Sequence, residues 1–263
     1  MKKVLAILMT LVMATVLLVG CAGGDKEPSG NGNGNGNQNP APTGDVKLYQ
    51  GVGTASNFRN GPGSDSEGVP VYSYNFVFAS AIFDAEGKVV DAEVDILEVS
   101  TPNYDGAGMP HFSGWPGKEG YNITDEDTGK VTGVSENTEE SVPKEIEEWV
   151  TKRERGDNYH MNPDNDWHKQ MDSFEKWFKG KTVAEIEDAF TTMFSDRNGR
   201  PLDPNTDNEE DKTKVDKLTD EQKSEVEDIR SGATMSLSDA HGDILGALKD
   251  AYENRKEMAA STK

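Results

Sequence analysis

The stretch YSYNFVFASAIFDAEGKVVDAEVDI, residues 72–96, contains two runs in which apolar side chains recur at every second position, Tyr72 to Phe78 and Val90 to Ile96. Alternation with a period of two is typical of β-strands that bury one face. Between the runs, Asp84-Ala85-Glu86-Gly87 has the composition of a turn. The sequence therefore predicts an antiparallel hairpin whose core face carries Tyr72, Tyr74, Phe76 and Phe78 from the first strand and Val90, Ala92, Val94 and Ile96 from the second.

Amphipathic helices are predicted in the second half of the chain. Residues 166–178 place apolar side chains at helical spacing, and a capping box over 182–185 starts a second helix. An apolar series over 244–252 predicts a last helix, with Ser236 or Ser238 as its N-cap. The core residues expected from these helices are Trp167, Met171, Phe174, Phe178, Val183, Ile186, Phe190, Phe194, Ile244, Leu245, Leu248, Ala251 and Tyr252. The predicted fold class is α+β, a single domain with an antiparallel sheet and packed helices.

The segment Asp228-Ile229-Arg230-Ser231-Gly232-Ala233-Thr234 precedes the predicted last helix. Ser231, Gly232 and Ala233 are small, so a bulky anion could approach the backbone N–H groups of this segment closely. A helix N-terminus favours negative charge, and Thr234 beside it would suit a covalently held phosphate. The alternative interpretation of residues 231–234 is an ordinary turn that ends one element and caps the next.

This segment resembles the attachment motif of the FMN-binding domains that carry flavin on a threonine through a phosphoester bond. The family includes flavin-carrying components of the sodium-pumping NADH:quinone oxidoreductase and of Rnf complexes, and extracellular flavin lipoproteins of Gram-positive bacteria. Its motif is Asp, two variable residues, then Ser/Thr-Gly-Ala-Thr, which Asp228, Ser231, Gly232, Ala233 and Thr234 match. The resemblance implies FMN bound covalently to Thr234, placed there by a flavin transferase that uses FAD, and an attachment turn that leads into a C-terminal helix.

Other residues are candidates for contact with the flavin. His241 and Asp243 are expected on the early turns of the last helix, where the histidine could donate a hydrogen bond to the flavin or its phosphate. The alternative is a partly exposed helix residue. The hairpin aromatics, and Trp115 in the Gly- and Pro-rich loop 100–120, could pack on the flavin ring or could belong to the core.

The N-terminus resembles a bacterial lipoprotein signal peptide over residues 1–20, with Lys2 and Lys3 before an apolar run that ends in Leu18-Val19-Gly20-Cys21. We expect lipidation of Cys21 and a location on the outer face of the cell membrane, held there by the lipid anchor; an uncleaved transmembrane anchor is the alternative. Gly-Asn pairs and prolines over 21–44 predict a flexible tether, followed by the domain over 45–258 and a tail over 259–263.

Composition and spacing exclude several classes of function. The chain has 48 Asp and Glu residues but only 27 Lys and Arg residues. Its formal net charge of −21 opposes binding to nucleic acid, which is itself negatively charged. Cys21 is the only cysteine, so we expect no cysteine-ligated iron–sulfur cluster. Residues 203–207 resemble the start of a calcium loop, but Asn208 and Lys214 stand where glycine and glutamate are needed, and no metal site is predicted. Residues 195–217 are expected to be a hydrophilic, mobile connection.

The sequence therefore predicts a membrane-anchored extracellular electron carrier. By resemblance, a membrane quinone-linked dehydrogenase would reduce its flavin, which would then pass electrons to extracellular acceptors. Whether the protein reduces such acceptors as an enzyme is left open. A solute-binding lipoprotein of a transporter, without covalent flavin, is the alternative, although the sequence shows no pair of repeating βαβ lobes. A structural or adhesive surface protein is a third possibility.

Overall fold

The computed structural model describes residues 47–104, 109–125 and 127–259. The predicted signal peptide, the lipidation residue Cys21 and the tether over 21–44 lie outside the described residues. The described part of residues 45–263 forms one compact unit. Within it, every helix is too short or too polar to cross a lipid bilayer.

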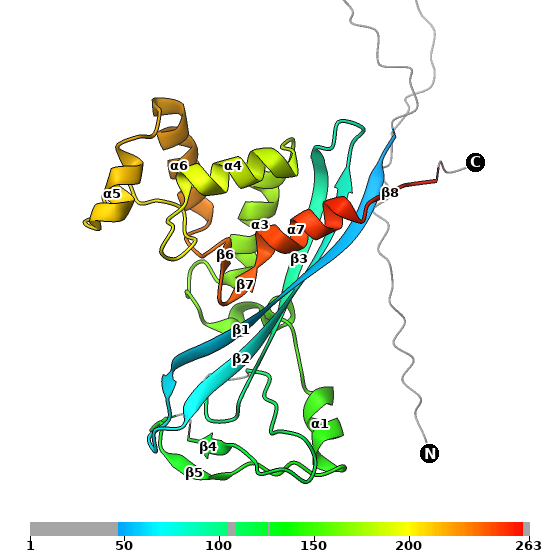
Figure 1. The fold of residues 1–263 in the computed structure, drawn as a ribbon, viewed down its shortest axis with the longest axis vertical. Coiled ribbons are helices and arrows are strands. Elements are labelled where there is room, and N and C mark those ends of the chain that lie inside the picture. The colour runs from blue at the N-terminus through cyan, green and yellow to red at the C-terminus, as the bar shows by residue number, and fades with distance from the viewer. Residues whose placement is uncertain (1–46, 105–108, 126, 260–263) are drawn as a thin grey trace, which may run out of the picture. The chain divides into compact units, whose positions relative to one another are not determined.

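A four-stranded antiparallel sheet organises this unit, and Figure 1 shows its three long strands side by side. The strand order is β3-β2-β1-β8, with bounds β1 Tyr49–Ser64, β2 Pro70–Phe83, β3 Val89–Ser100 and β8 Lys256–Glu257. The predicted hairpin is confirmed as β2 and β3, in which Phe78 pairs with Asp95. Its turn is closed by hydrogen bonds from the backbone nitrogens of Gly87 and Lys88 to Asp84.

Helices and short strands make up the rest of the described fold. The short strands are β4 Asn122–Thr124, β5 Val131–Val134, β6 Ser238–Asp239 and β7 Gly242–Asp243. The helices are α1 Ser141–Glu147, α2 Lys152–Arg155, α3 Trp167–Phe178, α4 Val183–Met193, α5 Glu209–Val215, α6 Asp220–Gly232 and α7 Ile244–Glu253, with a 3-10 turn at Gly156–Tyr159. This architecture confirms the predicted α+β class.

The core face of β2 is the opposite of the predicted one. The buried series is Val77, Ala79, Ala81 and Phe83, whereas Tyr74 and Phe78 are 52% and 45% exposed. The aromatic residues Phe58, Tyr72, Tyr74 and Phe76 instead contact one another on the solvent-facing side of the sheet. On β3 the prediction is correct for Ala92, Val94 and Ile96, which are buried, and wrong for Val90, which is exposed.

The reason for the reversed face is the close approach of α7 to β1 and β2, which Figure 1 shows. A Cβ atom at Gly53 would lie 2.1 Å from the backbone nitrogen of Ala251 and 2.2 Å from the carbonyl oxygen of Ala247. Only a face built from glycine and small side chains lets the helix backbone come so near. Tyr74, Phe76 and Phe78 therefore lie on the opposite face, and Phe83, at the end of β2, is the aromatic residue of this strand that is buried.

The predicted helices α3, α4 and α7 are confirmed, and α3 and α4 lie in one core cluster with β2 and β3. Thr182 and Glu185 form the expected capping box. Helix α6 was not predicted, although Thr219 and Gln222 form a second capping box that the sequence displays. The segment 195–217 is not a bare connection, because it contains α5 and buries Leu202 and Val215 in the core.

Gly53→Ala should destabilise the protein by about 2 kcal/mol or more, because the added methyl group meets helix backbone atoms that cannot move independently. Gly133→Ala is the matched control, since no atom lies within 4 Å of the position its Cβ would take. Urea unfolding followed by circular dichroism measures both. Equal stabilities of the two variants would contradict the described packing of α7.

Candidate functional site

The helix-covered face of the sheet changes from apolar to polar along the strands. Where α3 and α7 cover it, the face is apolar, but farther along it presents polar side chains that are in register with one another. Arg59 pairs with Ser73, and Asn75 pairs with Glu98. Ser73, Asn75 and Glu98 are buried. A polar cavity is expected where a buried sheet face carries such groups, because unpaired polar atoms are costly in an apolar core.

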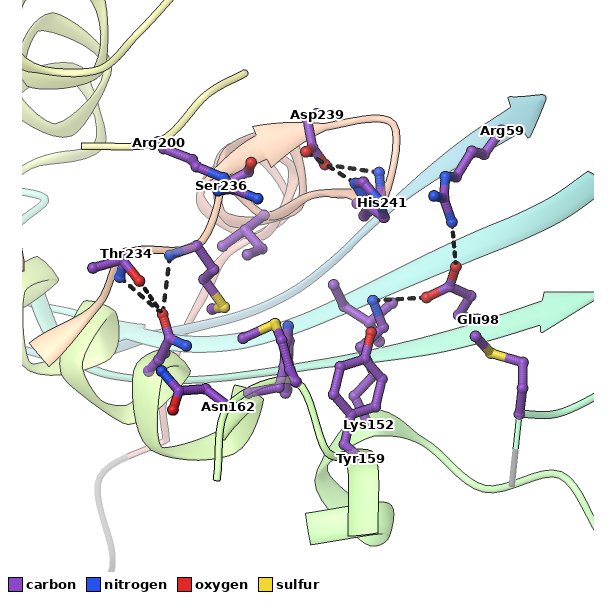
Figure 2. A pocket seen from close by; sticks show the side chains of 18 of the residues that line it. Arg59, Glu98, Lys152, Tyr159, Asn162, Arg200, Thr234, Ser236, Asp239 and His241 are labelled. Carbon is purple, nitrogen blue, oxygen red and sulfur yellow. Dashed lines mark hydrogen bonds and ion pairs between the residues drawn. The ribbon is translucent and has the colours of Figure 1, made fainter. Parts of the chain in front are cut away.

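A cavity of about 370 Å³ lies over this polar part of the sheet, within the size range of small-molecule sites. Figure 2 shows Thr234, Arg200 and Ser236 at one end and Arg59, Glu98 and Lys152 at the other. Its apolar wall comprises Ile96, Met109, Met161, Trp167, Met235 and Ile244. Thr234, which the sequence singled out, therefore lies on the cavity wall, as does His241.

The small residues before Thr234 have structural roles that differ from the predicted ones. Ser231 and Gly232 form the end of α6 and not a free turn, and the Ser231 hydroxyl donates to the Asp228 carbonyl at 2.7 Å. A Cβ at Gly232 would lie 2.6 Å from the Ser173 hydroxyl of α3. Ala233 is buried. Packing against α3 therefore accounts for the glycine, and burial in the core accounts for the alanine.

The expected helix N-terminus beside Thr234 is absent from the described fold. Helix α7 begins at Ile244 and its N-cap is Asp243, whose side chain accepts from the Gly246 nitrogen at 2.9 Å. The β6–β7 hairpin separates Thr234 from this helix. The predicted N-caps Ser236 and Ser238 are therefore wrong.

The segment around Thr234 is held by the side-chain amide of Gln170 on α3. Its Oε1 atom accepts from the backbone nitrogens of Thr234 at 2.8 Å and Met235 at 2.9 Å, and its Nε2 donates to the Asn165 carbonyl. Asn165 in turn donates to the Gly232 carbonyl at 2.9 Å. Gln170 is only 2% exposed. These bonds satisfy backbone groups at the end of α6 and fix the direction of the Thr234 side chain.

Thr234 is exposed, whereas both of its neighbours in the chain, Ala233 and Met235, are buried. Thr234 lines the cavity, and its hydroxyl donates to the Gln170 carbonyl oxygen at 3.4 Å. Arg200 lines the same end of the cavity, and its guanidinium forms no hydrogen bond or ion pair with any described residue. A guanidinium without a partner is suited to bind a phosphate through charge-assisted hydrogen bonds.

His241 lies in the β6–β7 hairpin and not on α7, which corrects the predicted location. Its Nδ1 is 3.0 Å from an Asp239 carboxylate oxygen, and its backbone nitrogen donates to Asp239 at 2.7 Å. Burial raises the pKa of Asp239, but hydrogen bonds from His241 and Ser236 outweigh it and lower that pKa to about 2. Asp239 is thus ionised at neutral pH and orients the imidazole at the cavity rim.

A buried ion-pair cluster, which was not predicted from the sequence, forms the other end of the cavity. Glu98 lies 3.0 Å from the Lys152 ammonium and 3.5 Å from the Arg59 guanidinium. Burial raises the pKa of Glu98, but Lys152, His241 and Arg59 hold it below its usual range. The sequence does carry a signal for the burial of Glu98. This residue follows Ala92, Val94 and Ile96 at the same spacing of two, which places it on the covered face of β3. No comparable sequence pattern predicts that Lys152 and Arg59 lie beside it.

The remaining predicted candidates lie elsewhere. Trp115 is 71% exposed and contacts Phe112, away from the cavity lining.

Among the described residues, no group of three or more His, Cys, Asp and Glu side chains could hold a metal ion.

The chain is similar to a protein of known name. A curated protein of Desulfitobacterium hafniense named chlorophenol reductase is 34% identical over 220 residues, which are 81% of this chain and 59% of that protein. The chain thus spans about three fifths of the relative's length. No protein-family model matches the chain. No solved structure matches it.

Asp239→Asn should lower the free energy of unfolding by roughly 2 kcal/mol at pH 7, given the lowered pKa of Asp239. The folded pKa lies below the unfolded value of 3.8, so this stabilisation is present above pH 3.8 and is lost as the pH falls towards 2. Urea unfolding of both proteins from pH 7 to pH 3 measures the difference. Glu227→Gln, an exposed carboxyl on α6, is the control, and a pH-independent difference for Asp239→Asn would refute the assignment.

Proposed function

We propose that this protein carries FMN covalently on Thr234 and uses it to transfer electrons. The observation that carries the proposal is the placement of Thr234. It is an exposed hydroxyl between two buried residues, on a segment held by Gln170, at the wall of a ligand-sized cavity. This placement agrees with the resemblance of residues 228–234 to a flavin attachment motif.

The residues around the cavity fit the two chemically different parts of FMN. The Arg200 guanidinium, which has no hydrogen-bond or ion-pair partner among the described residues, would hold the phosphate next to Thr234. Met161, Trp167, Met235 and Ile244 offer apolar surface for a flat ring. Such a group, when bound, supplies one- and two-electron chemistry that protein side chains lack.

The chain's own residues have distinct roles in this proposal. Gln170 and Asn165 orient the Thr234 backbone, so that its hydroxyl oxygen can form the phosphoester bond during maturation by a flavin transferase. The apolar wall excludes water from the ring. Asp239 holds His241 at the cavity rim, where the imidazole can exchange a proton with solvent.

A redox role is supported by the relative from Desulfitobacterium hafniense, whose name describes a reductase. The predicted lipidation of Cys21 would hold the domain at the outer membrane face, near a membrane quinone-linked dehydrogenase as electron donor. The strongly acidic chain disfavours nucleic acid as a partner.

A solute-binding lipoprotein is the weaker alternative. Receptors of that kind close two lobes around their ligand. The described residues instead form one compact unit with a single large antiparallel sheet, and no observation favours a hinged pair of lobes within it.

Thr234→Ala should abolish covalent flavin without unfolding the protein. Wild type co-expressed with a flavin transferase should gain the mass of FMN less water and stay fluorescent on a denaturing gel. The variant should show neither, while its stability changes by about 0.5 kcal/mol or less, as is usual for an exposed side chain.

Thr213→Ala removes another exposed threonine hydroxyl, on α5, and is the matched control that should keep full flavinylation. Intact-protein mass spectrometry gives the stoichiometry. An unmodified wild-type protein, with the transferase shown to be active on a known substrate, would overturn the proposal.

A further inference from the structure

The cavity has the opposite charge balance to the chain that encloses it. The whole sequence has 27 basic against 48 acidic residues. Among the described residues that line the cavity, the cationic ones are Arg59, Lys152 and Arg200, and the acidic ones are Glu98 and Asp239. These three cationic against two acidic side chains give the cavity lining an excess of positive charge inside an acidic protein.

Part of this excess lies at the end away from Thr234. There, two cations share one carboxylate, since Lys152 and Arg59 both face Glu98. Asp239 is paired with His241 at the rim, and Arg200 lies at the end near Thr234 (Figure 2). The cluster of Lys152, Glu98 and Arg59 thus keeps one positive charge that no described carboxylate neutralises.

The cluster is rigid and shielded from solvent. The side chains of Lys152 and Glu98 are 3% and 2% exposed. The Lys152 ammonium also lies 5.4 Å from the ring centre of Tyr159 and 5.9 Å from that of Trp167. A charge buried in this way is screened little by water or salt, so it acts strongly on any group that enters the cavity.

We propose that the cluster of Lys152, Glu98 and Arg59 stabilises the anion formed when a flavin ring in this cavity is reduced, and so raises the ring's reduction potential. The inference rests on the proposed attachment of FMN to Thr234. Two electrons from a quinol-linked donor and one proton from water convert the neutral oxidised ring into a reduced ring with one negative charge. The excess positive charge of the cluster compensates that negative charge.

A series of charge variants tests the proposal, because the cluster can be changed in both directions. Lys152→Met or Arg59→Gln removes the excess charge, Glu98→Gln raises it, and Lys152→Met with Glu98→Gln leaves it as in wild type. Lys249→Met, an exposed lysine on α7, is the control. Intact mass first establishes flavinylation, and thermal unfolding establishes folding. Spectroelectrochemical titration at pH 6 then gives the midpoint potential.

The midpoint potential should be lower than in wild type in Lys152→Met and in Arg59→Gln. We expect a decrease of at least about 30 mV, which corresponds to a tenfold change in the equilibrium constant for two-electron reduction. It should rise in Glu98→Gln and stay near wild type in the double variant and the control. If Lys152→Met fails to fold, Glu98→Gln and the double variant still decide the question.

A merely structural role would shift every cluster variant in the same direction, as the cavity loosens, and that result would refute the proposal. Equal potentials in all flavinylated variants would refute it too. Absence of flavin from wild type would instead refute the attachment to Thr234, so the two failures are distinguishable.

Discussion

One buried amide, that of Gln170, determines how the candidate site is built. Its carbonyl oxygen accepts from two consecutive backbone nitrogens, of Thr234 and Met235, and its nitrogen is held by Asn165. The same helix buries Phe174 and Phe178 in the core, so the segment after α6 is fixed to a helix that is itself packed in the core. An attachment residue needs such support, because a cofactor on a mobile segment would not keep a defined orientation.

The architecture could be predicted from the sequence, but the buried face of the sheet could not. Period-two alternation located β2 and β3, and capping signals located α4. Alternation alone does not decide which face is covered when both series are apolar, as Tyr74 and Phe78 alternate with Val77 and Ala79. The outcome depends on α7, whose backbone contacts Gly53 so closely that only small residues fit beneath it. This contact joins segments far apart in the chain and leaves no local pattern.

For the site, the sequence identified Thr234 but not its surroundings. The motif identified a residue that lines the cavity. The predicted turn and helix N-terminus were wrong because Ser231 and Gly232 belong to the end of α6 and the β6–β7 hairpin lies between Thr234 and α7. The charged end of the cavity comes from β1, β3 and α2, and only the folded sheet brings Arg59, Glu98 and Lys152 together. The proposed attachment residue is thus marked by a local motif, whereas the charges of the cavity are brought together by the tertiary fold.

The most direct test of the account is to map the flavin onto the chain. Trypsin should release residues 231–249 as one peptide, since Arg230 precedes it and Lys249 ends it. In protein matured with a flavin transferase, this peptide should carry FMN less water, and fragmentation should place the added mass on Thr234. Recovery of the same peptide unmodified, with flavin either absent or released when the protein is denatured, would contradict the central claim.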